Sequence, residues 1–335
     1  MNNNRILWAD YAKAFAIFSV VLLHVHCNEV LDKCINGYIM PLFFIISGYL
    51  FSYERNPGFK PFVLKRARQI LVPYVWINAV AYVAWLTVLR HYGDDAASCT
   101  QWYSPLVGIL AGIPHMLVHD IPTWSLLSFF VVETVYYVLR RHVGNGRILT
   151  AVLLITFIGL SHVFEDKMSV LPLALGPSLA GLLFYSAGHE LRESGVRAGA
   201  VFRGPVWPVS GIAFIISVCC NSYVEFYICS YGNIILFLAS SVSGAVFVIS
   251  TCVRLSERSL PSIIRFISES TLLICGFHLL VFAMIKGVML YMFGISPATL
   301  NENLLYGMLF AVSALMLTLP IAFVVRKYFG FLVDK

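Results

Sequence analysis

Long apolar runs separated by short polar segments dominate the pattern of this 335-residue chain. A helix crosses the hydrocarbon core of a bilayer in about 20 residues, with a range of roughly 17–25. Ten runs come near that length: residues 7–26, 37–53, 70–89, 121–139, 148–164, 168–188, 205–220, 233–253, 271–292 and 304–325. A further apolar segment, 106–118, is short and contains Gly and Pro, so we expect it at the outer interface or re-entrant. The pattern predicts an all-α polytopic membrane protein of about ten transmembrane helices.

Composition supports a membrane environment and one domain. Apolar residues make up 59% of the chain, charged residues only 12%, and the mean hydropathy is +0.81. A soluble domain has about 25% charged and 45–50% apolar residues. The loops between the runs are short, so we expect a single integral-membrane domain over residues 1–335, with the lipid bilayer as its solvent.

Lysine and arginine set the expected orientation. With the N-terminus inside, 18 of the 23 fall in cytoplasmic segments. These are Arg5, five in 55–68, three in 140–147, Arg192, Arg197, Arg203, Arg254, Arg258, Arg265, Arg326, Lys327 and Lys335. Only three fall outside, and two lie within helices. The positive-inside rule then predicts that both termini are cytoplasmic. Because the basic residues are dispersed and form no single patch, a nucleic-acid partner is excluded despite the net charge of +6.

Polar residues inside apolar runs are the candidates for function, because charge in a bilayer is costly unless it is paired or hydrated. In the first run, Asp10, Lys13 and His24 share one helical stripe. Lys13 and His24 are 11 residues apart, which is about three turns, or roughly 16 Å along the axis. Asp10 and Lys13 could instead simply neutralise each other at the inner interface.

Two further runs contain candidate residues. The second run contains Phe43, Phe44, Ser47 and Gly48. Ser and Gly permit close helix approach, so tight packing beside the first helix is the favoured interpretation of Ser47 and Gly48. Glu133 is the one acid in the fourth run, where a plain structural role is pairing with Lys286 or another polar group.

These residues together form recognisable motifs. A basic residue, ten residues and then His (Lys13 to His24), followed by Phe-Phe-x-x-Ser-Gly (Phe43 to Gly48), resembles the acyltransferase-3 family of membrane O-acyltransferases. Three weaker similarities agree. An arginine-rich segment that includes Arg66 and Arg68 runs into a proline-headed third helix, Trp124 opens the fourth, and His278 lies in a late histidine motif. The chain departs from the family in having Lys13 where Arg is more common, and in having Leu and Ser directly after the tryptophan motif, where one branch has Glu.

The resemblance implies a membrane O-acyltransferase of a bacterial plasma (inner) membrane. It would move an acyl group, most often acetyl, from cytoplasmic acyl-CoA to a hydroxyl of a cell-surface or lipid-linked glycan. Acyl-CoA, as a rule acetyl-CoA, would be a co-substrate, and no tightly bound cofactor is expected.

The resemblance and the residues together assign roles at the expected site. His24 would act as general base, because an imidazole titrates near neutrality; a covalent acyl-imidazole remains open. Lys13 would guide the donor, and Asp10 would orient or neutralise Lys13. Arg66 and Arg68 would either bind the anionic CoA head by charge-assisted hydrogen bonds or serve only as topology signals. Site-lining candidates are Phe43, Phe44, Ser47, Gly48, Trp124, Glu133 and His278.

A second class of function uses the same scaffold. A ten-helix protein with a central polar stripe could export or flip a glycan, or move a small solute. Such a transporter would more often show paired inverted repeats with broken helices, and none is evident.

The eight cysteines show no metal-ligand spacing, so no metal is expected. Five of them, Cys27, Cys34, Cys99, Cys220 and Cys229, fall on the outer side of the expected topology, where disulfides can persist. We expect a bridge within this set, with Cys27–Cys34 the closest pair in sequence.

Overall fold

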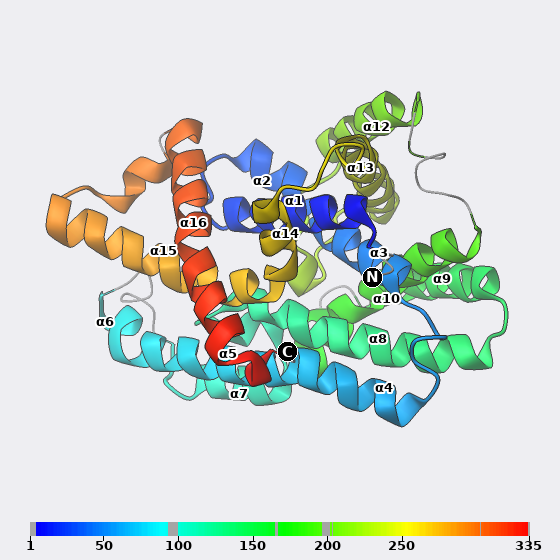
Figure 1. Cartoon of the computed structure of the whole chain (residues 1–335), viewed down its shortest axis with the longest axis horizontal. Helices are drawn as coiled ribbons and strands as arrows, with labels where there is room; N and C mark the ends of the chain where they lie inside the picture. Colours follow the sequence, from blue (N-terminus) through cyan, green and yellow to red (C-terminus); the bar gives the residue numbers. More distant parts are fainter. Residues whose placement is uncertain are drawn as a thin grey trace.

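The computed structural model describes residues 5–92, 100–164, 167–195, 202, 204–301 and 303–333, and that part of the chain is helical without strands (Figure 1). The longer helices are α1 (Leu7–Leu23), α2 (Glu29–Asn36), α3 (Ile39–Leu50), α4 (Phe59–Arg66), α5 (Val72–Ala84), α7 (Ser104–Ala111), α8 (Trp124–His142), α9 (Gly146–Val163), α10 (Leu175–Glu193), α12 (Val206–Cys220), α13 (Ile234–Leu255), α14 (Ser262–Glu269), α15 (Thr271–Phe293) and α16 (Leu304–Tyr328). Short 3₁₀ turns include η5 (Ile121–Thr123) before α8 and η8 (Phe226–Ile228) before α13.

Seven helical segments are long and apolar enough to cross a membrane. They are Glu29–Leu50, Phe59–Tyr92, Ile121–His142, Gly146–Val163, Ile234–Leu255, Thr271–Phe293 and Leu304–Tyr328. The other three expected spans coincide with α1, α10 and the 15-residue α12. The number ten and the orientation of the termini stay predictions, and Arg197, Arg203 and Lys335 lie outside the described residues. The segment 106–118 holds only α7 and a 3₁₀ turn, so it contains no helix of spanning length.

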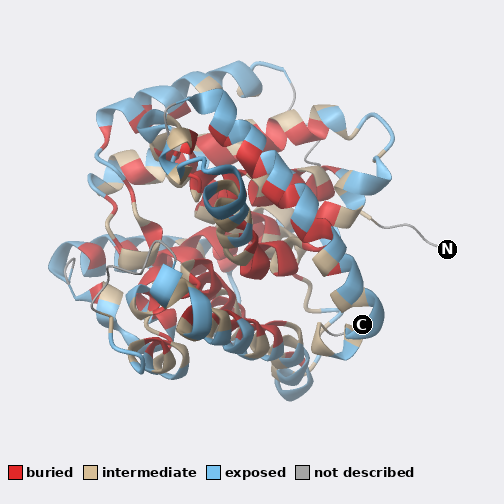
Figure 2. Ribbon diagram, turned by 90° about the vertical axis from the view of Figure 1, so that its left-hand side faces the viewer, coloured by how far each residue is buried: buried red, intermediate tan, exposed pale blue. Residues whose placement is uncertain are grey.

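Exposed residues, pale blue in Figure 2, lie along the outer helices, and many of the exposed side chains are large and apolar. Ile155, Ile235 and Met292 are 71%, 74% and 74% exposed, respectively. Soluble monomers rarely expose this much apolar surface, whereas it suits contact with lipid. The protein is therefore a membrane protein.

Asparagine side chains start four of the helices. Asn28, Asn145, Asn233 and Asn303 precede α2, α9, α13 and α16, and each side-chain oxygen accepts a backbone N–H from the first turn. These amide groups satisfy donors that a helix start leaves unpaired.

The basic segment 59–68, which we expected to be a loop, is helical. It forms α4, and a continuous helical segment runs from Phe59 to Tyr92 through two π-helical turns, Ala67–Leu71 (η1) and Trp85–Leu89 (η2). Pro73 lies just after η1. Proline lacks an N–H and crowds the carbonyl of the preceding turn, and a π turn at that point lets the helix continue.

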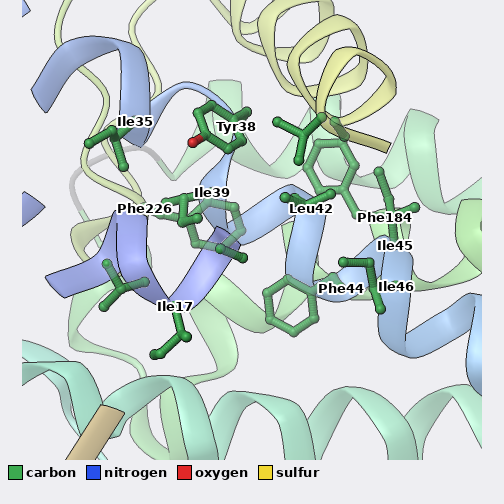
Figure 3. Close-up of a cluster of buried hydrophobic side chains, with 14 of the residues drawn as sticks. Ile17, Ile35, Tyr38, Ile39, Leu42, Phe44, Ile45, Ile46, Phe184 and Phe226 are labelled. Atoms are coloured by element: carbon green, nitrogen blue, oxygen red, sulfur yellow. The ribbon is translucent and has the colours of Figure 1, made fainter. Parts of the chain in front are cut away.

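α1 lies inside the bundle and packs against α3, α13, α14, α15 and α16. Its buried alanines, such as Ala12 and Ala16, permit close approach of these neighbours. Ile17 of α1 joins Phe44 of α3, Phe184 of α10 and Phe226 of η8 in the buried apolar cluster of Figure 3. This core fixes α1 beside α3.

The contact between α3 and α10 is made backbone to backbone through a reciprocal glycine pair. A Cβ at Gly48 would lie 1.9 Å from the carbonyl oxygen of Tyr185, and a Cβ at Gly188 would lie 2.1 Å from that of Ile45. Only glycine fits at either position.

The seven cysteines in the described part of the chain are free thiols. Cys27 and Cys34 are not bridged, nor are Cys220 and Cys229, so the disulfide expected among these residues is wrong. Cys27 instead packs against α16, where a Cβ at Gly307 would meet its side chain at 2.3 Å. Cys99 lies outside the described residues.

Candidate active site

A cavity of about 410 Å³ lies between α1, α3, α8, α15 and the end of α4, and η8 closes one side. Seven of the residues singled out from the sequence line it: Lys13, His24, Phe43, Ser47, Arg66, Trp124 and Glu133. Asp10, Phe44, Gly48, Arg68 and His278 do not. We call this the main cavity. Its wall is largely apolar, with polar groups gathered at its two ends, at Lys13 and at His24.

One face of α1 forms a wall of the main cavity. Lys13, Ile17, Val20 and His24 all line it. Lys13 and His24 share this face, as the stripe in the sequence predicts, but Asp10 of the same stripe does not line the cavity. Lys13 and His24 therefore lie at opposite ends, separated along α1 by roughly 16 Å. An extended ligand could touch both.

His24 is held with one ring nitrogen free. Its Nδ1 lies 2.7 Å from the carbonyl oxygen of Val20. A carbonyl oxygen can only accept, so this bond assigns the proton of the neutral ring to Nδ1 and leaves the lone pair on Nε2. That nitrogen is then available as a base at the cavity wall.

His278 stands behind His24 rather than in the cavity. The two rings have centroids 5.0 Å apart and meet edge to face. His278 is fully buried, and its Nδ1 bonds the carbonyl oxygens of Ile274 and Cys275. Within the described structure its Nε2 has no hydrogen-bond partner.

Asp10 belongs to a charged cluster at the start of α1. Its carboxylate accepts from Arg5 at 2.5 Å and from the Ser268 hydroxyl at 2.7 Å, whereas Lys13 Nζ is 3.8 Å away. Arg5 is thus the nearer partner of Asp10, and Lys13 is only weakly held. The sequence pattern did not reveal this partner.

Glu269, at the end of α14, completes this cluster. It accepts hydrogen bonds from three arginines, namely Arg5, Arg265 and Arg326. Burial opposes the charged form of this carboxyl, but the three arginines outweigh burial and hold the pKa of Glu269 at about 2. The cluster joins the ends of α1, α14 and α16.

Glu133 pairs with Arg66. Nε and Nη2 of Arg66 donate to the two carboxylate oxygens of Glu133, and Nη1 donates to Gln69 at 2.7 Å. Glu133 is 2% exposed. A bidentate pair of this kind is strong and geometrically specific. The partner of Glu133 is therefore Arg66, and Arg66 is committed before any ligand arrives.

The aromatic candidates divide between cavity and core. Phe43 lines the main cavity, whereas Phe44 packs in the core, with its ring 4.4 Å from that of Phe129. Trp124, the first residue of α8, lines the cavity and stacks on Phe226 with ring centroids 6.0 Å apart.

The His24 end of the main cavity is more polar than the sequence indicated. His26, Asn36, Tyr223, Glu225 and Tyr227 line it beside His24. Asn36 donates to the Tyr223 hydroxyl at 2.9 Å, and His26 bonds the buried carboxylate of Asp32 at 3.1 Å. These residues lie in short polar loops and in α2. Nothing in the sequence distinguishes these residues from ordinary loop residues. In the structure, only the left-handed backbone of His26 is unusual.

Metal ligands do not gather at the site. In the ranges the structure describes, no group of three or more His, Cys, Asp and Glu side chains could hold a metal ion.

The protein is a helical membrane protein with a histidine and a lysine at opposite ends of one internal cavity. This arrangement is typical of a membrane protein that acts on an extended substrate by acid–base chemistry. The model of the acyltransferase domain family matches residues 6–327, nearly the whole chain. The chain belongs to this family and is a membrane acyltransferase. Comparison with curated proteins and with solved structures gave no match.

Proposed function

We propose that the protein transfers an acyl group, acetyl in the first instance, from acyl-CoA to a hydroxyl of a cell-surface or lipid-linked glycan. The observation that carries this proposal is the main cavity, which joins Lys13 to the free Nε2 of His24. The donor would enter from the Lys13 end, and the acceptor would meet it at the His24 end.

The chemistry follows from His24. Nε2 takes the proton of the acceptor hydroxyl as its oxygen attacks the thioester carbonyl carbon. The C–S bond then breaks, an O-acyl ester forms, and the departing thiolate takes up the proton from the imidazolium. General-base catalysis of this kind contributes about 10²–10⁴-fold. In a two-step variant, Nε2 itself attacks the thioester carbonyl carbon, the C–S bond breaks and CoA departs as the thiolate. The acceptor oxygen then attacks the acyl-imidazole, the C–N bond breaks to regenerate neutral His24, and the thiolate takes up the hydroxyl proton.

The polar end of the main cavity suits a hydroxyl-rich acceptor. His26, Asn36 and Glu225 supply hydrogen-bonding groups, and Tyr223 and Tyr227 supply aromatic faces. Glu225 disfavours an anionic group at this end, so a neutral sugar is the favoured acceptor.

The proposed topology places both termini and the Lys13 end of α1 in the cytoplasm, with about ten spans in a bacterial inner membrane. It rests on the distribution of lysine and arginine. Labelling of single cysteines introduced at Arg141 and Arg258 should occur only after the inner face is exposed. Labelling of either site in intact cells would overturn this orientation.

Acyl-CoA turnover by purified protein tests the reaction. In lipid nanodiscs, the protein should release free CoA from radiolabelled acetyl-CoA in an acceptor-dependent manner, and cells with the gene should carry O-acetylated glycans that cells without it lack. A transporter on the same scaffold would move glycan without consuming acetyl-CoA. Absence of both turnover and glycan acetylation would refute the proposal.

A further inference from the structure

A second cavity of about 350 Å³ adjoins the Lys13 end of the main cavity. We call it the vestibule. Four cationic side chains line it, namely Lys13, Arg55, Lys65 and Arg66, together with polar groups of Ser52 and Asn56. No aspartate or glutamate is among its lining residues in the described structure. The vestibule is therefore cationic without an internal counter-charge.

Two of the four cations have their charge uncommitted. Arg66 is paired with Glu133, and Lys13 lies 3.8 Å from the Asp10 carboxylate. Neither Arg55 nor Lys65 makes a hydrogen bond or ion pair to another described residue. Both side chains are exposed at the mouth of the vestibule, so both can turn toward a ligand.

Two neighbouring cavities are also basic, but each contains two carboxylates among its lining residues. One contains Arg140, Arg141 and Arg192 together with Glu54 and Glu193. The other contains the cations Arg5, Lys13, Arg55 and Arg192 together with the carboxylates Asp10 and Glu269. Carboxylates in these cavities repel an anionic ligand, so the vestibule is the stronger anion site.

The vestibule adjoins the main cavity across three shared residues. Lys13, Ser47 and Arg66 line both. A ligand with its phosphates in the vestibule and an extended arm along α1 would carry its far end over the roughly 16 Å that separate Lys13 from His24. A phosphorylated thioester donor has this form, with the anionic groups and the reactive carbonyl at opposite ends.

We propose that the vestibule binds the phosphate groups of the acyl-CoA donor, with Arg55 and Lys65 as phosphate ligands that the sequence pattern did not single out. This inference rests on the proposed function. Arg66, held by Glu133, is then a positioning residue at the junction of the two cavities, and Arg68 has no part in the vestibule. Guanidinium and ammonium groups bind phosphate by charge-assisted hydrogen bonds.

The test measures CoA binding and acyl transfer with the full chain in neutral-lipid nanodiscs. The variants are Arg55→Gln, Lys65→Gln and the double variant. Lys60→Gln is the matched control, since Lys60 is an exposed cation on the same helix as Lys65 and lies outside the vestibule. Each single substitution should raise the Kd for CoA about tenfold, the double variant by about a hundredfold, and the control by less than twofold.

Kinetics and a phosphate-free donor sharpen the test. The double variant should raise the KM for acetyl-CoA, with kcat at saturating donor unchanged. Acetyl-pantetheine, which has no phosphate, should react equally with wild type and variant. Added salt should weaken CoA binding to wild type more than to the double variant. Because both positions are exposed, gel filtration should show wild-type folding.

The outcomes separate the inference from the proposed function. If wild type transfers acetyl groups and the double variant keeps the KM of the Lys60→Gln control, the vestibule assignment is wrong and the function stands. If wild type transfers nothing, the function is wrong. Binding of inorganic pyrophosphate then decides the anion site: loss in the double variant supports it, and unchanged or absent binding overturns it.

Discussion

Replacing His24 by asparagine separates its role as a base from its role in the helix. The asparagine amide can keep the donor position of Nδ1, which bonds the Val20 carbonyl at 2.7 Å, but it has no counterpart of Nε2. His24→Gln does the opposite, because its amide reaches toward the position of Nε2 without being able to take a proton. Both variants should insert into the membrane and bind CoA.

The expected loss follows from the chemistry. Removing a general base costs about 10²–10⁴ in rate, which corresponds to about 2.7–5.4 kcal/mol of transition-state stabilisation. The hydrogen bond to Val20 lies within one helix, and its loss in His24→Gln costs only about 1 kcal/mol of stability. If either His24 variant folds but its kcat falls a hundredfold or more, the loss is therefore that of the general base and not of stability.

The assay is single-turnover release of CoA from acetyl-CoA by purified protein with saturating acceptor. His278→Asn is the control, because His278 contacts the His24 ring but does not line the cavity. It should lose less activity than either His24 variant. If His24→Asn and His24→Gln both stay within a few fold of wild type, His24 is structural, and the base must be sought at His278 or Glu133.

Three further predictions concern charge and packing. Lys13→Arg should keep much of the kcat/KM for acetyl-CoA and Lys13→Ala little, since charge is what this position supplies; equal activities would refute the assignment. Gly48→Ala should destabilise the protein by about 3 kcal/mol, because its Cβ would lie 1.9 Å from a backbone oxygen. Gly159→Ala is the control, because a Cβ there would have nothing within 4 Å. Its thermal midpoint in detergent should be near that of wild type or above it. Glu269→Gln should cost about 1–3 kcal/mol at neutral pH. Folding lowers the pKa of Glu269 from 4.5 to about 2. The difference in unfolding free energy between wild type and Glu269→Gln should therefore be constant above about pH 5 and shrink as the pH falls toward 2. Unfolding scans in which this difference grows in acid would contradict the role of the cluster.

The helices and half of the site could be predicted from sequence because both depend on local periodicity. Each expected span overlaps a helix, although α10 begins seven residues later than the expected span 168–188, and the interval of 11 residues places Lys13 and His24 on one face of α1. The pairing of Arg66 with Glu133 could not be predicted in this way, because it joins residues 67 positions apart on two helices. The sequence alone does not indicate which faces of α4 and α8 meet.

Other features of the site could not be predicted because the residues involved look like ordinary loop residues in the sequence. Asn36 and Glu225 lie in short polar segments that resemble solvated loops. Asn36 lines the cavity from the end of α2, and Glu225 lines it from the loop before η8, which packs against α10. The segment that forms α4 was expected to be a loop because it is basic and lies between two apolar runs, and the π turn that accommodates Pro73 has no sequence pattern of its own. Arg5 gave no sign that it would bridge Asp10 and Glu269.

The glycine contact between α3 and α10 determines which walls of the main cavity can move when a ligand binds. Side chains accommodate a moving ligand by changing rotamer, but two backbones in direct contact have no such freedom. The wall formed by Phe43 and Ser47 is therefore stiff, since Gly48 locks α3 to the Tyr185 carbonyl. We expect any widening that admits a bulky acceptor to come from the loop around Glu225, which lines the cavity through side chains. A spin label on that loop should report motion during turnover, and one on α3 should remain still.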